Sequence, residues 1–268
     1  MLDIPALDRP RLRSPPHVSE AHVTAPSLVG LALVVFASAA IGPRQSTPEL
    51  PGQVLDVTAD KYFFRAPATA RPGLTTIRLH SPHGGHQLQL FRLEGGHSVA
   101  DLVKASAADA PTPWAKAMGG PGFPPMGGTV NATYILEPGT YAIVCAVHEP
   151  DGLRHYQKGM FAQMSVAGRR VAGTLPTPDV VVTEVDYKWK FSRPLSAGRH
   201  VLRVTNAGTT FHEMKILRLL PGHTYADAKA WKRGEPRVDE AVATVTTMAP
   251  GVSVITAIDF PPGDYLLF

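Results

Sequence analysis

Apolar and polar residues alternate along much of this chain, with the period of two that is typical of β-strands with one buried face. The clearest case is residues 54–64, Val-Leu-Asp-Val-Thr-Ala-Asp-Lys-Tyr-Phe-Phe, where β-branched and aromatic side chains predominate. Similar patterns predict strands at residues 74–79, 87–93, 130–136, 141–145, 160–166 and 180–191. Pro-Gly pairs at 72–73 and 138–139 are among the turn signals that separate these segments, so we expect antiparallel sheets joined by turns.

Two stretches of the chain are near copies of each other. Residues 86–101, HQLQLFRLEGGHSVAD, recur as residues 212–227, HEMKILRLLPGHTYAD, with His, Arg, Gly, His and Asp in register. The period of about 125 residues is too long for a solenoid and suits two copies of one domain. We therefore predict a first domain at residues 53–167, a linker at 168–178 and a second domain at 179–268.

Each copy also carries the signal of one short helix. Ser98-Val-Ala-Asp101 and Thr224-Tyr-Ala-Asp227 have the form of a capping box, in which the acidic side chain reaches back to the amide of the capping residue. An Ala-containing stretch follows each box. The sequence thus predicts an all-β protein of two tandem Greek-key β-sandwiches, each with one short helix.

The first 44 residues do not fit this pattern. Residues 28–41 are apolar and uncharged and end in Ala37-Ser-Ala-Ala40. Such a stretch is too short to cross a bilayer comfortably and has the small-residue ending of a secretory signal. We predict a leader at residues 1–44, either a signal or a retained membrane anchor, and an exported, periplasmic or extracytoplasmic protein. A buried core helix is the alternative.

Composition and charge add further limits. The formal net charge of +4 is spread along the chain without a basic run, so nucleic acid is not expected as a partner. The 24 Gly and 26 Pro residues suit a turn-rich β protein better than a helical one. Cys145 is the only cysteine, so it must be free, paired between chains or bound to metal.

Cys145 opens a loop with further metal-binding side chains. The loop reads Cys145-Ala-Val-His148-Glu-Pro-Asp-Gly-Leu-Arg-His155-Tyr-Gln-Lys-Gly-Met160, and His86 lies upstream at the mouth of a predicted strand. A thiolate, imidazoles and a weakly bound thioether are the ligands of a blue copper site. The pattern therefore predicts copper bound by His86, Cys145, Met160 and one loop histidine, with His155 favoured and His148 as the alternative.

In these residues the chain resembles the cupredoxins, a family of blue, or type 1, copper domains. Their last loop supplies Cys, His and Met between the final two strands, and four residues separate His155 from Met160 here, as in plastocyanin-like domains. The resemblance implies a copper cofactor and places the first histidine ligand where His86 lies and where the second copy has His212. His83 is a weaker candidate because it has no counterpart in the second copy.

The resemblance favours an electron carrier over an oxidase. Multicopper oxidases and nitrite reductases have a His directly before the Cys, where this chain has Val144, and the sequence contains no His-x-His pair. We expect outer-sphere electron transfer to a cytochrome-like or oxidase-like redox partner. The partner would dock at an apolar patch to which residues 119–128 could contribute. The alternatives are copper storage or delivery by the same ligands, and a metal-free extracytoplasmic sandwich module.

The second copy is incomplete by the same comparison. Residues 136–144 correspond to residues 260–268, and the sequence stops one position before the counterpart of Cys145. The apolar ending Tyr265-Leu-Leu-Phe268 would leave a strand edge without a partner. We expect the natural chain to continue past Phe268 with a second loop.

Overall fold

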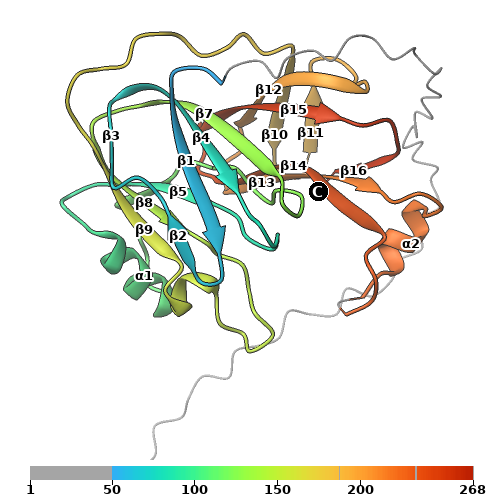
Figure 1. Cartoon of the computed structure of the whole chain (residues 1–268), viewed down its shortest axis with the longest axis horizontal. Coiled ribbons are helices and arrows are strands. Elements are labelled where there is room, and N and C mark those ends of the chain that lie inside the picture. The colour runs from blue at the N-terminus through green and yellow to red at the C-terminus, as the bar shows by residue number, and fades with distance from the viewer. Residues whose placement is uncertain (1–49, 187, 233, 268) are drawn as a thin grey trace, which may run out of the picture. The chain divides into compact units, whose positions relative to one another are not determined.

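The computed structural model describes residues 50–186, 188–232 and 234–267 (Figure 1). The strands of the first half are β1 (Gln53–Asp60), β2 (Phe63–Arg65), β3 (Thr69–Ala70), β4 (Gly73–His80), β5 (Gln89–Leu93), β6 (Ala115–Ala117), β7 (Thr129–Leu136), β8 (Gly139–Val144) and β9 (Phe161–Val166). Those of the second half are β10 (Val180–Val185), β11 (Lys188–Phe191), β12 (Gly198–Asn206), β13 (His212–Leu219), β14 (Asp239–Met248), β15 (Ser253–Phe260) and β16 (Tyr265–Leu267). The described helices are α1 (Val99–Ala107), α2 (Tyr225–Ala230) and the 3-10 turn η1 (His155–Lys158).

Three sheets carry these strands. An eight-stranded sheet runs in the order β11-β10-β12-β15-β7-β4-β1-β2, a five-stranded sheet β3-β9-β8-β5-β6, and a three-stranded sheet β14-β13-β16. The two halves pair their strands alike, because β1 with β4 and β10 with β12 are parallel, whereas β4 with β7 and β12 with β15 are antiparallel. The prediction of an all-β fold of cupredoxin-like sandwiches, each with one short helix, is confirmed. The expectation of antiparallel sheets was wrong, because the sheets are mixed.

The alternation in the sequence buries one face of β1 and one face of β10. Leu55, Val57 and Ala59 face inward from β1, and Val180 and Val182 do so from β10. These side chains belong to one hydrophobic cluster that spans both halves. Since burial of one large aliphatic side chain stabilises the fold by roughly 1.5–3 kcal/mol, this cluster provides the rigid frame on which the loops are mounted.

Two strand predictions were wrong in one respect. Residues 54–64 form not one strand but the hairpin of β1 and β2, in which Asp60 lies opposite Phe63. Lys61 and Tyr62 make the turn, where the Asp60 carboxylate accepts the Lys61 N–H. Residues 180–191 divide in the same way into β10 and β11. Neither Lys61 nor Tyr62 is a turn-forming residue type, so the alternating pattern did not reveal the break.

Both predicted helix starts are confirmed. Ser98 Oγ accepts the Asp101 N–H at 3.2 Å, and Asp101 Oδ2 accepts the Ser98 N–H at 2.8 Å. Thr224 and Asp227 repeat this capping box at α2. Figure 1 shows α1 beside β8 and β9. There it packs in a second hydrophobic cluster that includes Tyr156 of η1.

The Gly/Pro segment at residues 119–124 is largely buried between the two halves. The N–H groups of Gly119 and Gly122 donate to carbonyls of β14, each at 3.0 Å. A Cβ atom on Gly120 would lie 2.1 Å from the backbone oxygen of Leu88, so only glycine permits this approach. Of the residues that we expected in a docking patch, exposure begins only at Pro125.

The described residues from 50 onward belong to one compact unit, and the domain boundaries at 53–167, 168–178 and 179–268 stay a prediction. The predicted leader at residues 1–44 lies outside the described residues. Within the described part of the chain, no helix has the length and apolar character needed to cross a membrane.

Candidate metal centre

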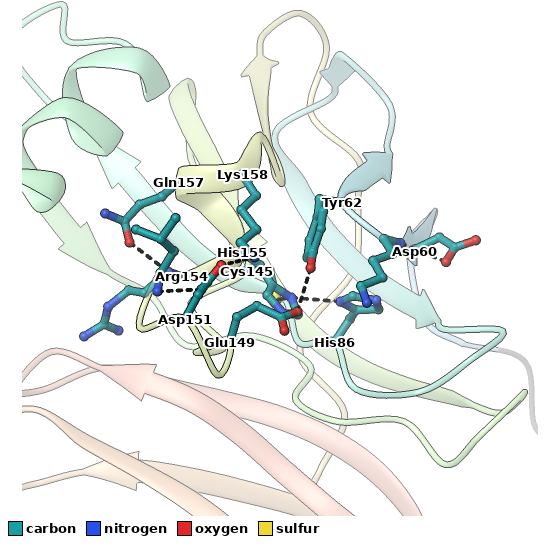
Figure 2. Close-up of polar contacts among 12 residues, drawn as sticks. Asp60, Tyr62, His86, Cys145, Glu149, Asp151, Arg154, His155, Gln157 and Lys158 are labelled. Carbon is teal, nitrogen blue, oxygen red and sulfur yellow. Dashed lines mark hydrogen bonds and ion pairs between the residues drawn. The ribbon is translucent and has the colours of Figure 1, made fainter.

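Three of the predicted ligands meet at one end of the first half. His86 precedes β5, Cys145 directly follows β8, and His155 begins η1. Their residues are 5%, 0% and 4% exposed, respectively. One donor atom of each lies within 4.8 Å of the others (Figure 2). Two ring nitrogens and one sulfur therefore form a buried cluster.

The ring nitrogens that face this cluster are the Nδ1 atoms. His155 Nδ1 lies 3.1 Å from His86 Nδ1 and 3.4 Å from Cys145 Sγ. His155 Nε2 lies on the other side of its ring, 2.9 Å from Glu149 Oε1. A neutral imidazole carries only one N–H, so donation from Nε2 to Glu149 leaves the Nδ1 lone pair of His155 directed at the cluster.

Backbone hydrogen bonds fold the loop that carries the cluster. The Cys145 N–H donates to the Met160 carbonyl at 3.2 Å, and the Tyr156 N–H donates to the Cys145 carbonyl at 3.0 Å. The His155 N–H donates to Val147 at 2.9 Å. Gly159 ends η1 with φ = 99°, a left-handed conformation that favours glycine and turns the chain into β9. The ligand residues are thus fixed by their backbone rather than by side-chain packing alone.

Met160, the predicted axial ligand, is fully buried and directly precedes β9. Its N–H donates to the His155 carbonyl at 3.0 Å. Its side chain belongs to the same hydrophobic cluster as Cys145. The structure therefore brings Met160 to the ligand loop through its backbone, and its role as a ligand stays a prediction.

The weaker candidates lie outside the cluster. His148 is exposed in the loop, and the His83 side chain is 77% exposed. His212, in the second half, is half-buried, with Nε2 3.3 Å from Asp186 Oδ1. Of the two loop histidines between which the sequence left a choice, the geometry favours His155.

Burial governs the protonation of the cluster. It raises the pKa of the Cys145 thiol above its ordinary value. It lowers the pKa of His86, which the neighbouring His155 lowers further. Burial also lowers the pKa of His155, although Glu149 opposes this effect. The metal-free site therefore favours a neutral thiol and neutral rings, and a metal ion that binds there must displace the thiol proton.

Glu149 and Tyr62 were not among the predicted site residues. The Tyr62 hydroxyl donates to Glu149 Oε1 at 2.8 Å, the oxygen that also lies 2.9 Å from His155 Nε2. The Tyr62 ring meets the His155 ring edge-on, with 5.1 Å between centroids. Figure 2 shows this line of contacts from Tyr62 through Glu149 to His155. A carboxylate, and not an apolar patch, thus contacts the outer edge of the His155 ring.

A recess of about 390 Å³ lies over the cluster. His86 and His155 line it together with polar side chains that include His83, His148 and Asp60. The charged side chains of Asp60, Lys61 and Glu149 therefore lie at the approach to the cluster.

No known protein family and no curated protein matches the chain. Among solved structures, a dithionite-reduced auracyanin of Roseiflexus castenholzii is 20% identical over 43% of this chain and 98% of its own, with a TM-score of 0.32. Auracyanin A of Chloroflexus aurantiacus, a blue copper protein, is 17% identical over 42% of this chain and 98% of its own, with a TM-score of 0.30. A blue copper oxidase of Nitrosomonas europaea is 14% identical over 80% and 78%, respectively, with a TM-score of 0.23.

In its sheets and in its buried His-Cys-His cluster, this chain is cupredoxin-like.

Proposed function

We propose that this chain is a type 1 copper protein that carries one electron at a time, with His86, Cys145, His155 and Met160 as the copper ligands. The observation that carries the proposal is the buried cluster whose two nitrogens and one sulfur lie within 4.8 Å of one another. Two imidazoles, a thiolate and a weak axial thioether form the donor set of protein blue copper sites.

The residues present fit a copper ion. Buried polar atoms are normally satisfied by separate partners, but here His86 Nδ1 and His155 Nδ1 face each other at 3.1 Å and can share only one proton between neutral rings. Cys145 Sγ lies beside them. Sulfur ligands favour Cu(I), whereas imidazoles suit both oxidation states, so this mixed set supports a reversible one-electron couple.

The surrounding residues of the chain would prepare this site. Copper, when bound, would supply a centre that gains and loses one electron. Cys145 would be held as a thiolate, and the N–H groups of Gln87 and Val147 hydrogen-bond to its sulfur and favour that negative charge. Burial of the ligands excludes water, and the fixed loop limits their movement between oxidation states. No bond is made or broken when the electron leaves.

We further propose that the electron passes to a cytochrome-like or oxidase-like partner outside the cytoplasm. The predicted leader at residues 1–44 supports the location. The recess beside His86 and His155 is also lined by Asp60, Lys61 and Glu149, which supports a docking surface that includes charged groups. Redox partners of this kind usually meet through small, short-lived interfaces.

Visible absorption of the copper-loaded full chain tests the site. We expect an intense thiolate-to-copper band that Cys145→Ser abolishes. His155→Ala should also abolish it, whereas His148→Ala, a matched change in the same loop, should leave it in place. A wild-type protein that binds copper without this band would refute a type 1 site.

Copper delivery by the same ligands is the second candidate. The recess favours it, because the exposed side chains of His83 and His148 and the cluster residues His86 and His155 line the same space and could pass an ion inward. Copper binding without the thiolate band and without a reversible potential would support delivery. A protein that binds no copper would support a metal-free sandwich module.

A further inference from the structure

One carboxylate contacts the candidate copper site from the side that faces away from the donor atoms. Glu149 Oε1 lies 2.9 Å from His155 Nε2, while the opposite ring nitrogen, Nδ1, faces Cys145 Sγ at 3.4 Å. Both partners are shielded, since the side chain of His155 is 5% exposed and that of Glu149 is 17% exposed. Hydrogen bonds to a charged acceptor in such surroundings are short and directional.

We propose that Glu149 is a positioning residue that fixes the tautomer and the ring orientation of His155 for copper binding, an inference that rests on the proposed copper function. By accepting the Nε2–H, Glu149 keeps the ring proton off Nδ1, the atom that would bind the metal. Histidines that bind metals commonly donate their other N–H to a carboxylate or carbonyl, which orients the ring and makes it a stronger ligand.

Glu149 is itself held in place from two directions. Its carboxylate accepts the Tyr62 hydroxyl at 2.8 Å, and its backbone N–H donates to the Leu153 carbonyl at 2.8 Å. The ammonium of Lys158 lies 5.1 Å from the centre of the Tyr62 ring, where a cation is attracted to the ring face. Because both ends of Glu149 are anchored, it can impose one orientation on His155 instead of following that ring.

The carboxylate also adds negative charge beside the copper site. Negative charge stabilises Cu(II) more than Cu(I), so Glu149 should lower the reduction potential of the site. An ion pair with a purely structural role would change stability but neither the tautomer of His155 nor the ratio of the two copper affinities. These two properties therefore separate positioning from simple packing.

The first test uses the metal-free full chain. Nitrogen NMR of histidine-labelled protein reports which ring nitrogen carries the proton. We expect the Nε2–H tautomer of His155 in the wild type, a mixture of tautomers in Glu149→Ala, and recovery in Glu149→Gln, whose amide oxygen can still accept the hydrogen bond. Asp151→Ala is the matched control, since Asp151 lies in the same loop and pairs with Lys158.

The second test uses the copper-loaded chain. Loss of such an outer hydrogen bond typically lowers metal affinity by about 10–100-fold, and we expect this for Cu(II) in Glu149→Ala, with a smaller loss for Cu(I). A tenfold difference between the two losses would raise the midpoint potential by about 59 mV. Glu149→Gln should restore part of the affinity but not the potential, because it lacks the charge. Tyr62→Phe keeps the carboxylate and should change the potential by less than Glu149→Ala, and Asp151→Ala should leave it unchanged.

The outcomes distinguish this inference from the copper function. If the wild type shows the thiolate band but Glu149→Ala behaves like Asp151→Ala in tautomer, affinity and potential, Glu149 has no positioning role and the copper function stands. If the wild type binds no copper, the copper function fails, and an unchanged His155 tautomer in Glu149→Ala overturns the positioning role on its own. Should Glu149→Ala not fold, Glu149→Gln carries the comparison of potentials, because it lacks the charge, and a potential equal to that of the wild type would overturn the inference.

Discussion

Glu184 is a buried carboxyl group in the second half of the protein. It is 2% exposed in β10, and neither of its oxygens has a hydrogen-bond partner among the residues that the structure describes. Burial, with a smaller contribution from the nearby Glu213, raises the pKa of Glu184 from its ordinary 4.5 to about 7. We predict that Glu184→Gln stabilises the protein in alkaline solution and has little effect in acid.

The sign of this pH dependence follows from the difference in proton binding between the folded and unfolded states. Because the pKa is higher in the folded than in the unfolded state, the folded state binds more protons between pH 4.5 and about 7, and stability falls as the pH rises through this range. The pKa difference of about 2.5 units, at about 1.4 kcal/mol per unit, sets an upper limit of about 3 kcal/mol. An ionised side chain can draw water toward itself, so we expect roughly 1–3 kcal/mol.

Urea unfolding of the metal-free wild type and of Glu184→Gln, at about pH 4.5 and about pH 8.5, measures this effect. Trp189 lies opposite Glu184 across the β10–β11 pairing, so its fluorescence reports on the unfolding of this region. The difference in stability between the two proteins should grow by roughly 1–3 kcal/mol from the lower to the higher pH. The titration of all other groups largely cancels in this comparison.

Glu213→Gln provides a graded control. It should produce a smaller stabilisation of the same sign at high pH, because Glu213 is the lesser cause of the raised pKa of Glu184. A stability difference between wild type and Glu184→Gln that is equal at both pH values would refute the reasoning. The Glu184 carboxyl would then be solvated or paired in the folded state.

Two further predictions concern the junction and the ligand loop. Gly120→Ala should destabilise the protein by roughly 1–3 kcal/mol in urea unfolding, because its Cβ would lie 2.1 Å from the Leu88 carbonyl oxygen. Lys116→Ala, a change at an exposed position, is the control. Equal stability of the two variants would contradict the close approach. In the metal-free protein the Cys145 thiol, which is fully buried, should react with a thiol reagent at least about 100-fold more slowly than in urea. Rapid labelling of the folded protein would mean that the loop is open.

In the first half, the apolar pattern located β1, β4, β5, β7, β8 and β9 to within a few residues, but it missed the short strands β3 and β6. It failed where the chain turns without glycine or proline, at Lys61 and Tyr62. It also failed at residues 119–124, whose composition is typical of an exposed loop. In this segment the glycines do not form an exposed loop but let the buried backbone approach β14 and Leu88 closely.

The cluster of His86, Cys145 and His155 could be predicted because its signals are local. The Cys loop carries two of the residues within one short segment, and the repeat singled out His86 from its neighbours. Contacts of Glu149 were not predictable in this way. Its partner Tyr62 lies 87 positions away on a hairpin turn that the pattern did not show.

Glu184 did leave a signal in the sequence, although it was not recognised. In the run Val180-Val-Val-Thr-Glu184-Val, side chains at positions 180, 182 and 184 share one face of the strand. Val180 and Val182 are fully buried, so the same parity places Glu184 inward. A charged residue at an inward position of an alternating strand is therefore a usable indication of a perturbed pKa.

The buried cluster of donor atoms depends on the Cys loop rather than on the sandwich that carries it. Each half places a histidine at the start of a corresponding strand, but His86 meets Cys145 and His155, whereas His212 contacts the carboxylate of Asp186. The hydrogen bonds that shape the preceding loop differ as well. Asn206 donates to two carbonyls and accepts one N–H in the second half, while Ser81 accepts two N–H groups with its carbonyl in the first.

The two halves share the same strand pairings but carry different polar groups. Where the loop brings in a thiol and a second imidazole, three buried donors face one another and favour a soft cation. In the second half, burial raises the pKa of Glu184 to about 7, so this carboxyl group retains its proton in weakly acidic solution. Because Cys145 and Met160 are themselves fully buried members of the hydrophobic cluster that spans both halves, only a change that keeps the side-chain volume, such as Cys145→Ser, should remove a donor atom and leave the fold intact.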